Sequence, residues 1–379
     1  MAKLVRFVTA LPVATAVVMA PITASVAWTP TAASAPFDPP APPATIFEVG
    51  GAGWETLPES TMRAILGYRY DTPGNTFVNI EWPAYLGTLG DSVDQASDDL
   101  YALIGTTDGP EVAVGLSGST LVMNEVMRRL DEDPNPPASP DKITFVIVGD
   151  AERGLIPAIV ALTGPNLPLV NYTAKPIPVT AYNAIVVTGE YDGLADWPDR
   201  PWNLLAVANA WLGSPASEGY GEIHWDSIFN SLDEVPAENI TTVVNAKGGT
   251  TINYLVPTPE VPLLYPLHAM GVPQDAIDVL NSVLKPIVDA GYSRTDPAWL
   301  KNLTGAGSAA AAQPSATQTV SAVRESVGAS HASTVKPPKA ASVAAKRVAA
   351  AAATSVEAPA AKPADIRRAA TGRAGATAR

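Results

Sequence analysis

Short apolar runs alternate along this chain with segments of helical spacing. Runs rich in Val, Ile and Phe occupy residues 44–53, 75–83, 111–115, 143–149 and 182–193, and most of them end in or beside glycine or proline. Residues 92–104 and 119–130 instead repeat apolar side chains at helical spacing, with Asp91 and Ser92 as candidate caps of the first. Strands that alternate with helices favour parallel β-α-β units, so the sequence predicts an α/β fold with a mostly parallel sheet flanked by helices.

Three later segments add detail to this fold. Residues 150–180 are irregular and Pro-rich, which predicts an insertion that covers the strand ends as a lid. From residue 240, two β-rich runs surround Lys247-Gly248-Gly249 and predict a C-terminal hairpin. Residues 273–292 have a helical pattern that we expect Pro286 to break or kink.

Both ends of the chain differ from the body at residues 36–302, which we expect to form one domain. Lys3 and Arg6 precede an apolar run and small residues near Ala35, which predicts a signal peptide over residues 1–35. An uncleaved membrane anchor is the alternative. Either one places the body outside the cytoplasm, secreted or in the cell envelope. Residues 303–379 are rich in Ala, Ser, Thr and Pro, which predicts a disordered tail because such a segment cannot repay its ordering entropy.

Charge divides the body from the tail. The tail holds 10 of the 24 Lys and Arg residues and 3 of the 37 Asp and Glu residues, which leaves 14 basic and 34 acidic residues elsewhere. Because export excludes nucleic acid as a natural partner, we expect the basic tail to meet an anionic membrane or envelope surface, or to act as a solvated spacer. The oligomeric state stays open.

The segment from Glu111 to Leu130 carries the chemistry. A strand ends at Gly115, Ser117 and Gly118 follow, and a helix begins at Ser119. Strand, tight turn and helix in this order are typical of a nucleophile elbow, in which small neighbours let strand and helix pack closely. The Gly118 N–H would help to bind an oxyanion at the helix N-terminus. The alternative is a Gly/Ser turn without chemistry.

A serine nucleophile needs a base and an acid, and the chain has only three histidines. His224 lies in a loop-like, glycine-flanked stretch and follows Asp192, which directly follows a strand. Other histidines are His268, beyond the hairpin, and His331, in the tail; other acids are Asp196 and Glu190. In the GGAG of residues 50–53, Gly51 or Ala52 would supply a second oxyanion N–H. The chain has no cysteine, and this chemistry needs neither a metal nor an organic cofactor.

Several of these motifs closely resemble the PE-PPE domain of mycobacteria and their relatives. GGAG, the G-x-S-x-S elbow, EYDGLADWP and YLVPTPEVPLLYPL occur in the family's order between Thr45 and Arg294. The resemblance implies an α/β-hydrolase fold, Ser117 as nucleophile, His224 as base and an acid in the YDGLAD segment. It also implies acyl-ester or glycolipid substrates, with acyl transfer between trehalose glycolipids in some members.

The chain also departs from the family. The predicted signal peptide stands where a PE or PPE module would be. Leu116 and Gly118 replace residues that are often Tyr and Gln, so the preferred substrate stays open. An alternative function is a non-catalytic protein of the cell envelope with a hydrolase-like fold, because a fold does not fix a function.

Overall fold

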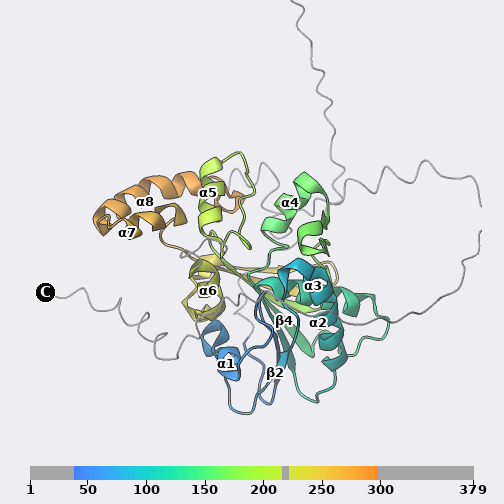
Figure 1. Ribbon diagram of the computed structural model, residues 1–379. Coiled ribbons are helices and arrows are strands. Elements are labelled where there is room, and N and C mark those ends of the chain that lie inside the picture. The colour runs from blue at the N-terminus through green and yellow to red at the C-terminus, as the bar shows by residue number, and fades with distance from the viewer. Residues whose placement is uncertain (1–37, 216–221, 298–379) are drawn as a thin grey trace, which may run out of the picture. The chain divides into compact units, whose positions relative to one another are not determined.

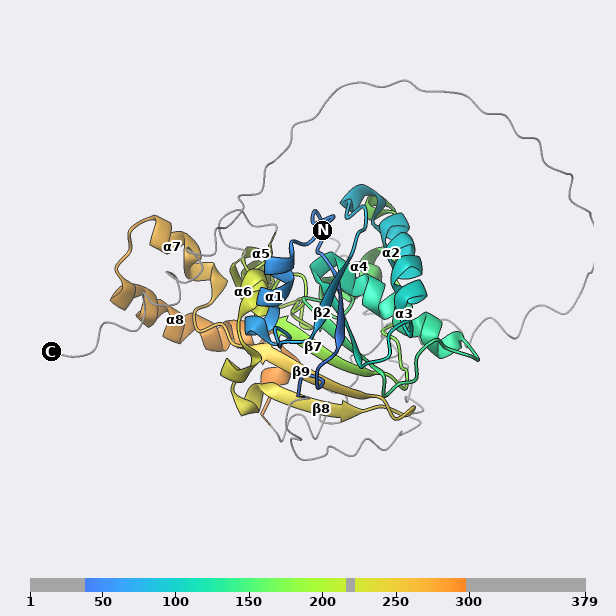
Figure 2. The ribbon, with the colours of Figure 1, turned by 90° about the horizontal axis from the view of Figure 1, so that it is seen from below.

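The computed structural model describes residues 38–215 and 222–297. Its main feature is a seven-stranded sheet in the order β2-β1-β3-β4-β7-β9-β8 (Figures 1 and 2). All neighbours are parallel except β8 and β9, which form the predicted hairpin. The predicted α/β fold, with a mostly parallel sheet flanked by helices, is confirmed. The strands are β1 (Thr45–Val49), β2 (Thr76–Ile80), β3 (Glu111–Leu116), β4 (Ile143–Val148), β7 (Asn183–Gly189), β8 (Ile240–Val244) and β9 (Thr250–Val256).

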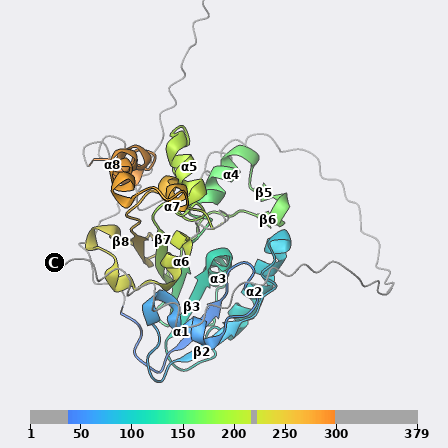
Figure 3. The same cartoon turned by 60° about the vertical axis from the view of Figure 1, so that its left-hand side comes forward.

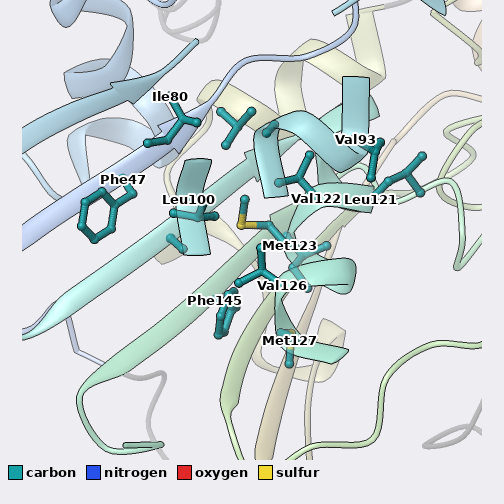
Figure 4. Packing of buried hydrophobic residues seen from close by; sticks show 14 of the residues in the cluster. Phe47, Ile80, Val93, Leu100, Leu121, Val122, Met123, Val126, Met127 and Phe145 are labelled. Carbon is teal, nitrogen blue, oxygen red and sulfur yellow. The ribbon is translucent and has the colours of Figure 1, made fainter. Parts of the chain in front are cut away.

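The helices cover both faces of this sheet. They are α1 (Glu59–Tyr68), α2 (Leu89–Leu103), α3 (Thr120–Glu132), α4 (Leu155–Thr163), α5 (Leu204–Leu212), α6 (Glu222–Phe229), α7 (Tyr265–Ala269) and α8 (Gln274–Asp289). Helices α2 and α3 bury their apolar sides on one face, where Leu100 and Met123 meet Phe145 of β4 (Figure 4). Helices α1 and α6 cover the other face. Among the described residues, no helix combines the length and the apolar character needed to cross a membrane.

A third, smaller core lies apart from these two. Tyr191, Ala206 of α5, Ile223 of α6 and Ile277 of α8 belong to it. It therefore joins α5 and α8 to the segment that follows β7, and Figure 1 shows α5, α7 and α8 grouped together at one end of the fold.

Strand register brings four strand ends together. Val49 of β1 pairs with Gly115 of β3, Leu116 pairs with Val148 of β4, and Val148 pairs with Val187 of β7. Because the strands are parallel, the residues after each of them meet at one edge of the sheet, where ligands bind in open α/β folds.

Several local expectations were wrong. Helix α2 begins at Leu89 directly after a 3-10 turn, so Asp91 and Ser92 lie inside it and do not cap it. Helix α8 runs past Pro286 to Asp289, so the expected break is absent. The segment around His224 is helix α6 and not a loop.

The insertion is also more regular than expected. Residues 150–180 contain α4 and a small antiparallel pair, β5 (Asn166–Leu167) and β6 (Tyr172–Thr173). Pro157 is tolerated because it falls in the first turn of α4, where its missing N–H costs no helical hydrogen bond. The predicted signal peptide at residues 1–35, the tail at residues 303–379 and His331 lie outside the described residues.

Candidate active site

Ser117 sits on a strained turn between β3 and α3. Its φ angle is +54°, a left-handed conformation that costs free energy for a residue with a side chain. Gly115, two residues earlier, has no room for a side chain: a Cβ there would lie 2.6 Å from Met123 Cγ and 2.8 Å from the Ser119 carbonyl oxygen. The close packing of strand on helix that an elbow requires is therefore present, and the side chain of Ser117 stays partly accessible.

Ser119 does more than provide a small neighbour. Its buried hydroxyl accepts a hydrogen bond from the Leu116 N–H (2.8 Å) and lies 2.7 Å from the Val49 carbonyl oxygen, to which it donates. The Leu116 carbonyl oxygen is a second acceptor at 3.0 Å. One hydroxyl thus ties the turn of Ser117 to the end of β1.

His224 and Asp192 form a buried pair across 32 residues of sequence. His224 Nδ1 lies 2.6 Å from Asp192 Oδ2, and both side chains are almost completely buried. The other oxygen, Asp192 Oδ1, accepts the Leu194 N–H at 2.9 Å. The carboxylate therefore fixes the imidazole with Nδ1 protonated, which leaves Nε2 as an acceptor. Within the described chain, Nε2 is buried and makes no hydrogen bond, Ser117 Oγ included.

Gly149 places the imidazole beside the strand that carries Ser117. It follows β4, the neighbour of β3, and a Cβ on it would lie 2.6 Å from His224 Cε1. Its φ of +74° also favours glycine. The ring of His224 thus packs on the backbone one strand away from Ser117. Hydrogen bonds of catalytic groups are often loose without substrate and tighten when it binds.

The alternative acids have other partners. Asp196 accepts hydrogen bonds from the Tyr191 N–H and from Arg294, both at 2.7 Å. Burial raises the pKa of Asp196 to about 6, although the Arg294 charge opposes this shift. Glu190 accepts the Thr258 N–H at 2.9 Å. Neither acid is bonded to His224, whereas Asp192 is.

The remaining candidate histidine within the described residues lies elsewhere. His268 Nε2 is 2.7 Å from Glu260 Oε1 in an exposed pair beyond the hairpin. Among the described residues it makes no hydrogen bond with Asp192, so the geometry gives it no part in a site with Ser117.

Residues 50–53 approach the turn closely. A Cβ on Gly51 would lie 3.3 Å from Ser117 Cβ, and one on Gly118 would lie 3.2 Å from the Ala52 nitrogen. The amides of Gly53 and Trp54 are bonded to the carbonyl oxygens of Ala84 and Gly51. In contrast, the Ala52 N–H has no hydrogen-bond partner among the described residues. Ala52 and Gly118 thus lie side by side next to Ser117, as an oxyanion site requires.

Two tryptophans connect residues 50–53 with His224. Trp54, directly after residues 50–53, stacks on Trp225 with ring centroids 5.1 Å apart. Trp225 also packs edge-on against the His224 ring at 6.0 Å. The position of Trp225 next to His224 was visible in the sequence, but its partner Trp54 was not predicted. The only sequence signal for it was a large aromatic residue directly after a glycine-rich strand end.

A buried carboxylate that the sequence did not single out anchors the insertion. Glu152 accepts hydrogen bonds from Asn124 (2.9 Å) and Arg128 (3.0 Å) of α3. On its other side it accepts from the Tyr172 hydroxyl at 2.5 Å and the Lys175 N–H at 3.3 Å. Burial raises the pKa of Glu152, and the Arg128 charge opposes this. The insertion is thereby fastened to the helix that begins next to Ser117.

Comparisons with known proteins identify the family of this chain. Residues 68–293 match the model of the PE-PPE domain family. Diacyltrehalose acyltransferase Chp2 of Mycobacterium tuberculosis is 38% identical over 216 residues, which cover 55% of this chain and 58% of that protein. Esterase PE16 of the same organism is 33% identical over 189 residues, which cover 48% of this chain and 34% of that protein. The chain spans about half the length of the curated relatives it matches, or less.

Solved structures give a weaker match. RedJ, the thioesterase from the prodiginine biosynthetic pathway in Streptomyces coelicolor, aligns with 62% of this chain and 90% of its own. Its sequence identity is 15% and its TM-score is 0.27.

Proposed function

The chain belongs to the PE-PPE domain family, and on that premise we propose that it is an exported serine enzyme acting on carboxylic esters of lipids. Ser117 is the nucleophile, His224 the base, and Asp192 the acid that orients His224. The observation that carries the proposal is the buried 2.6 Å contact between His224 Nδ1 and Asp192 Oδ2, one strand away from a strained serine. A buried acceptor without a partner is costly, and its presence at Nε2 supports a role in proton transfer.

The reaction proceeds in two halves. His224 Nε2 takes the proton of the Ser117 hydroxyl while Oγ attacks the ester carbonyl carbon. The amides of Gly118 and Ala52, beside Gly51, stabilise the negative charge on the carbonyl oxygen. The intermediate collapses, the alcohol leaves with the proton from His224, and an acyl group stays on Ser117. In the second half, His224 Nε2 takes the proton of an acceptor hydroxyl, whose oxygen attacks the acyl carbon. The proton then returns to Ser117 Oγ as the bond between Ser117 and the acyl group breaks.

The identity of the acceptor separates an esterase from an acyltransferase. One relative is named as a diacyltrehalose acyltransferase and another as an esterase, so both outcomes have a precedent in similar proteins. We propose that acyl chains pass between trehalose glycolipids. The stacked Trp54 and Trp225 support this, because aromatic faces suit sugar rings and acyl chains alike.

The test is to incubate the purified chain with an acylated trehalose donor and an isotopically labelled trehalose acceptor, and to resolve the products by mass spectrometry. We expect labelled acyl-trehalose with the wild-type chain and none with Ser117→Ala. If donors with several acyl-chain lengths give free fatty acid and no labelled acyl-trehalose, the chain is an esterase and not an acyltransferase. No turnover with any ester would contradict the proposal as a whole.

A further inference from the structure

Helix α5 presents its large apolar side chains to solvent and its small ones to the protein. Leu204 is 75% exposed and Trp211 is 61% exposed, whereas Ala206, Asn209 and Ala210 are buried. The buried side packs tightly, since a Cβ on Gly291 would lie 2.3 Å from Ala206 Cβ. A helix of a globular domain normally buries its leucines and tryptophans. The reversed arrangement leaves an apolar stripe on the outside of α5.

Helix α4 and the turn after it have the same character. Residues 154–174 contain no charged side chain, and α4 has no fully buried residue. Leu162 of α4 and Leu169 of the following turn are almost fully exposed. Residues 201–215, around α5, also contain no charged side chain.

These two segments stand beside the candidate active site. Figures 1 and 3 show α4 and α5 next to each other beyond the sheet. The Leu155 N–H at the start of α4 donates to the Leu194 carbonyl oxygen, two residues past Asp192, at 2.8 Å. We call the exposed side chains of both segments the apolar rim. It consists of Leu162, Leu169, Trp202, Leu204, Leu205 and Trp211.

The charge of the chain indicates which kind of lipid surface the apolar rim binds. Outside residues 303–379 the chain has 34 acidic and 14 basic residues, and the rim segments offer no cation to an anionic headgroup. Helices that bind anionic membranes carry Lys and Arg beside their apolar face, and these helices carry none. Exposed tryptophans are suited to the boundary between headgroups and hydrocarbon. An uncharged lipid surface is therefore the partner that fits.

We propose that the apolar rim docks the chain onto the surface of an assembled, uncharged lipid and so holds the site of Ser117 at that surface. The benefit of docking for catalysis rests on the proposed function, but docking itself is a binding property and can be measured without turnover.

The experiment measures vesicle binding by flotation with the full chain carrying Ser117→Ala. We expect binding to phosphatidylcholine vesicles, and with residues 305–379 deleted we expect no increase when phosphatidylglycerol is added. Leu204→Glu and Trp211→Glu should each lower the partition coefficient by about tenfold or more. Val244→Glu is the matched control, because Val244 is also an exposed apolar residue. It pairs with Thr250 at the start of β9, so it lies at the N-terminal ends of the parallel strands, whereas Ser117 lies at their C-terminal ends. Val244→Glu should leave binding unchanged.

Three outcomes would overturn the proposal. The first is that the Ser117→Ala chain does not float with vesicles while the wild-type chain hydrolyses a soluble ester. The proposed function would then remain intact. Another is binding that requires phosphatidylglycerol and disappears when residues 305–379 are deleted, since the basic tail would then be the contact. The third is a dimer in sedimentation experiments that Trp211→Glu dissociates, since a second copy would then cover the rim. Vesicle binding without any esterase activity would support the rim and contradict the proposed function alone.

Discussion

The Ser119 hydroxyl lies 2.7 Å from the Val49 carbonyl oxygen and so links the turn of Ser117 to the strand that leads into residues 50–53. Both proposed oxyanion donors lie beside this link. Removing the hydroxyl leaves the buried Leu116 N–H without the acceptor that it has now. The position of Gly118 relative to Ala52 thus depends on a side chain that takes no part in the reaction.

We expect Ser119→Ala to lower kcat for a short p-nitrophenyl ester by at least about tenfold, with a smaller change in KM. The free energy of unfolding should fall by about 1–3 kcal/mol because a buried donor loses its partner. Urea titration and steady-state kinetics measure the two effects. Ser97→Ala is the matched control, since the Ser97 hydroxyl is equally buried and has no hydrogen-bond partner within the described chain. Unchanged kcat in Ser119→Ala would contradict a positioning role.

The two neighbouring aspartates should respond differently to the same substitution. Asp192→Asn should lower kcat by about 10⁴, because the amide no longer holds the imidazole in its working tautomer. Asp196→Asn breaks a contact with Arg294 and should lower stability more than kcat. Ester kinetics and thermal unfolding of both variants make the comparison. A larger loss of kcat in Asp196→Asn would move the acid to that position.

Asp196 also predicts how stability depends on pH. Its pKa is raised from an ordinary 3.8 to about 6 by burial, so the folded chain keeps a proton that the unfolded chain releases near pH 4. The contribution of Asp196 to the free energy of unfolding should therefore fall as pH rises from about 4 to 6, by up to about 3 kcal/mol, and stay constant above. The difference between wild type and Asp196→Asn, measured by urea titration at several pH values, isolates it. A difference that does not change over this window would contradict the raised pKa.

Gly149 should matter because of the imidazole that packs on it. In Gly149→Ala, the new Cβ would lie 2.6 Å from His224 Cε1 and would push the ring aside. We expect a loss of kcat of at least about 100-fold, as for a displacement of about 1 Å. Gly248→Ala is the control, because its φ of +87° imposes the same backbone strain and nothing lies within 4 Å. Equal kinetics in the two variants would show that His224 does not act from this position.

The sequence predicted most of the sheet and the turn of Ser117, because these depend on short local patterns. The seven strands of the main sheet follow compact apolar runs, and the elbow follows from small residues around Ser117. The chain order of nucleophile, acid and base led to Asp192 and His224, which the structure brings together.

Features that depend on distant partners could not be predicted in this way. The glycines at 219 and 221 led to the prediction of a loop around His224. The segment is instead helix α6, which is stabilised by packing against β7 and α1. Helix α8 continues through Pro286 to Asp289, although an interior proline removes one helical hydrogen bond. The hydrogen bonds of Glu152 connect residues up to 28 positions away, and those of Ser119 reach Val49, 70 positions away. No local pattern in the sequence marks either of them.

The central claim is that Ser117 is the nucleophile, and covalent labelling tests it most directly. The wild-type chain, Ser117→Ala and Asp192→Asn are treated with a fluorophosphonate, and the labelled peptide is identified by mass spectrometry. We expect one phosphonylated residue, Ser117, in the wild-type chain, slow labelling in Asp192→Asn, and none in Ser117→Ala. Labelling of Ser117→Ala at the wild-type rate, or no labelling of a folded wild-type chain, would contradict the claim.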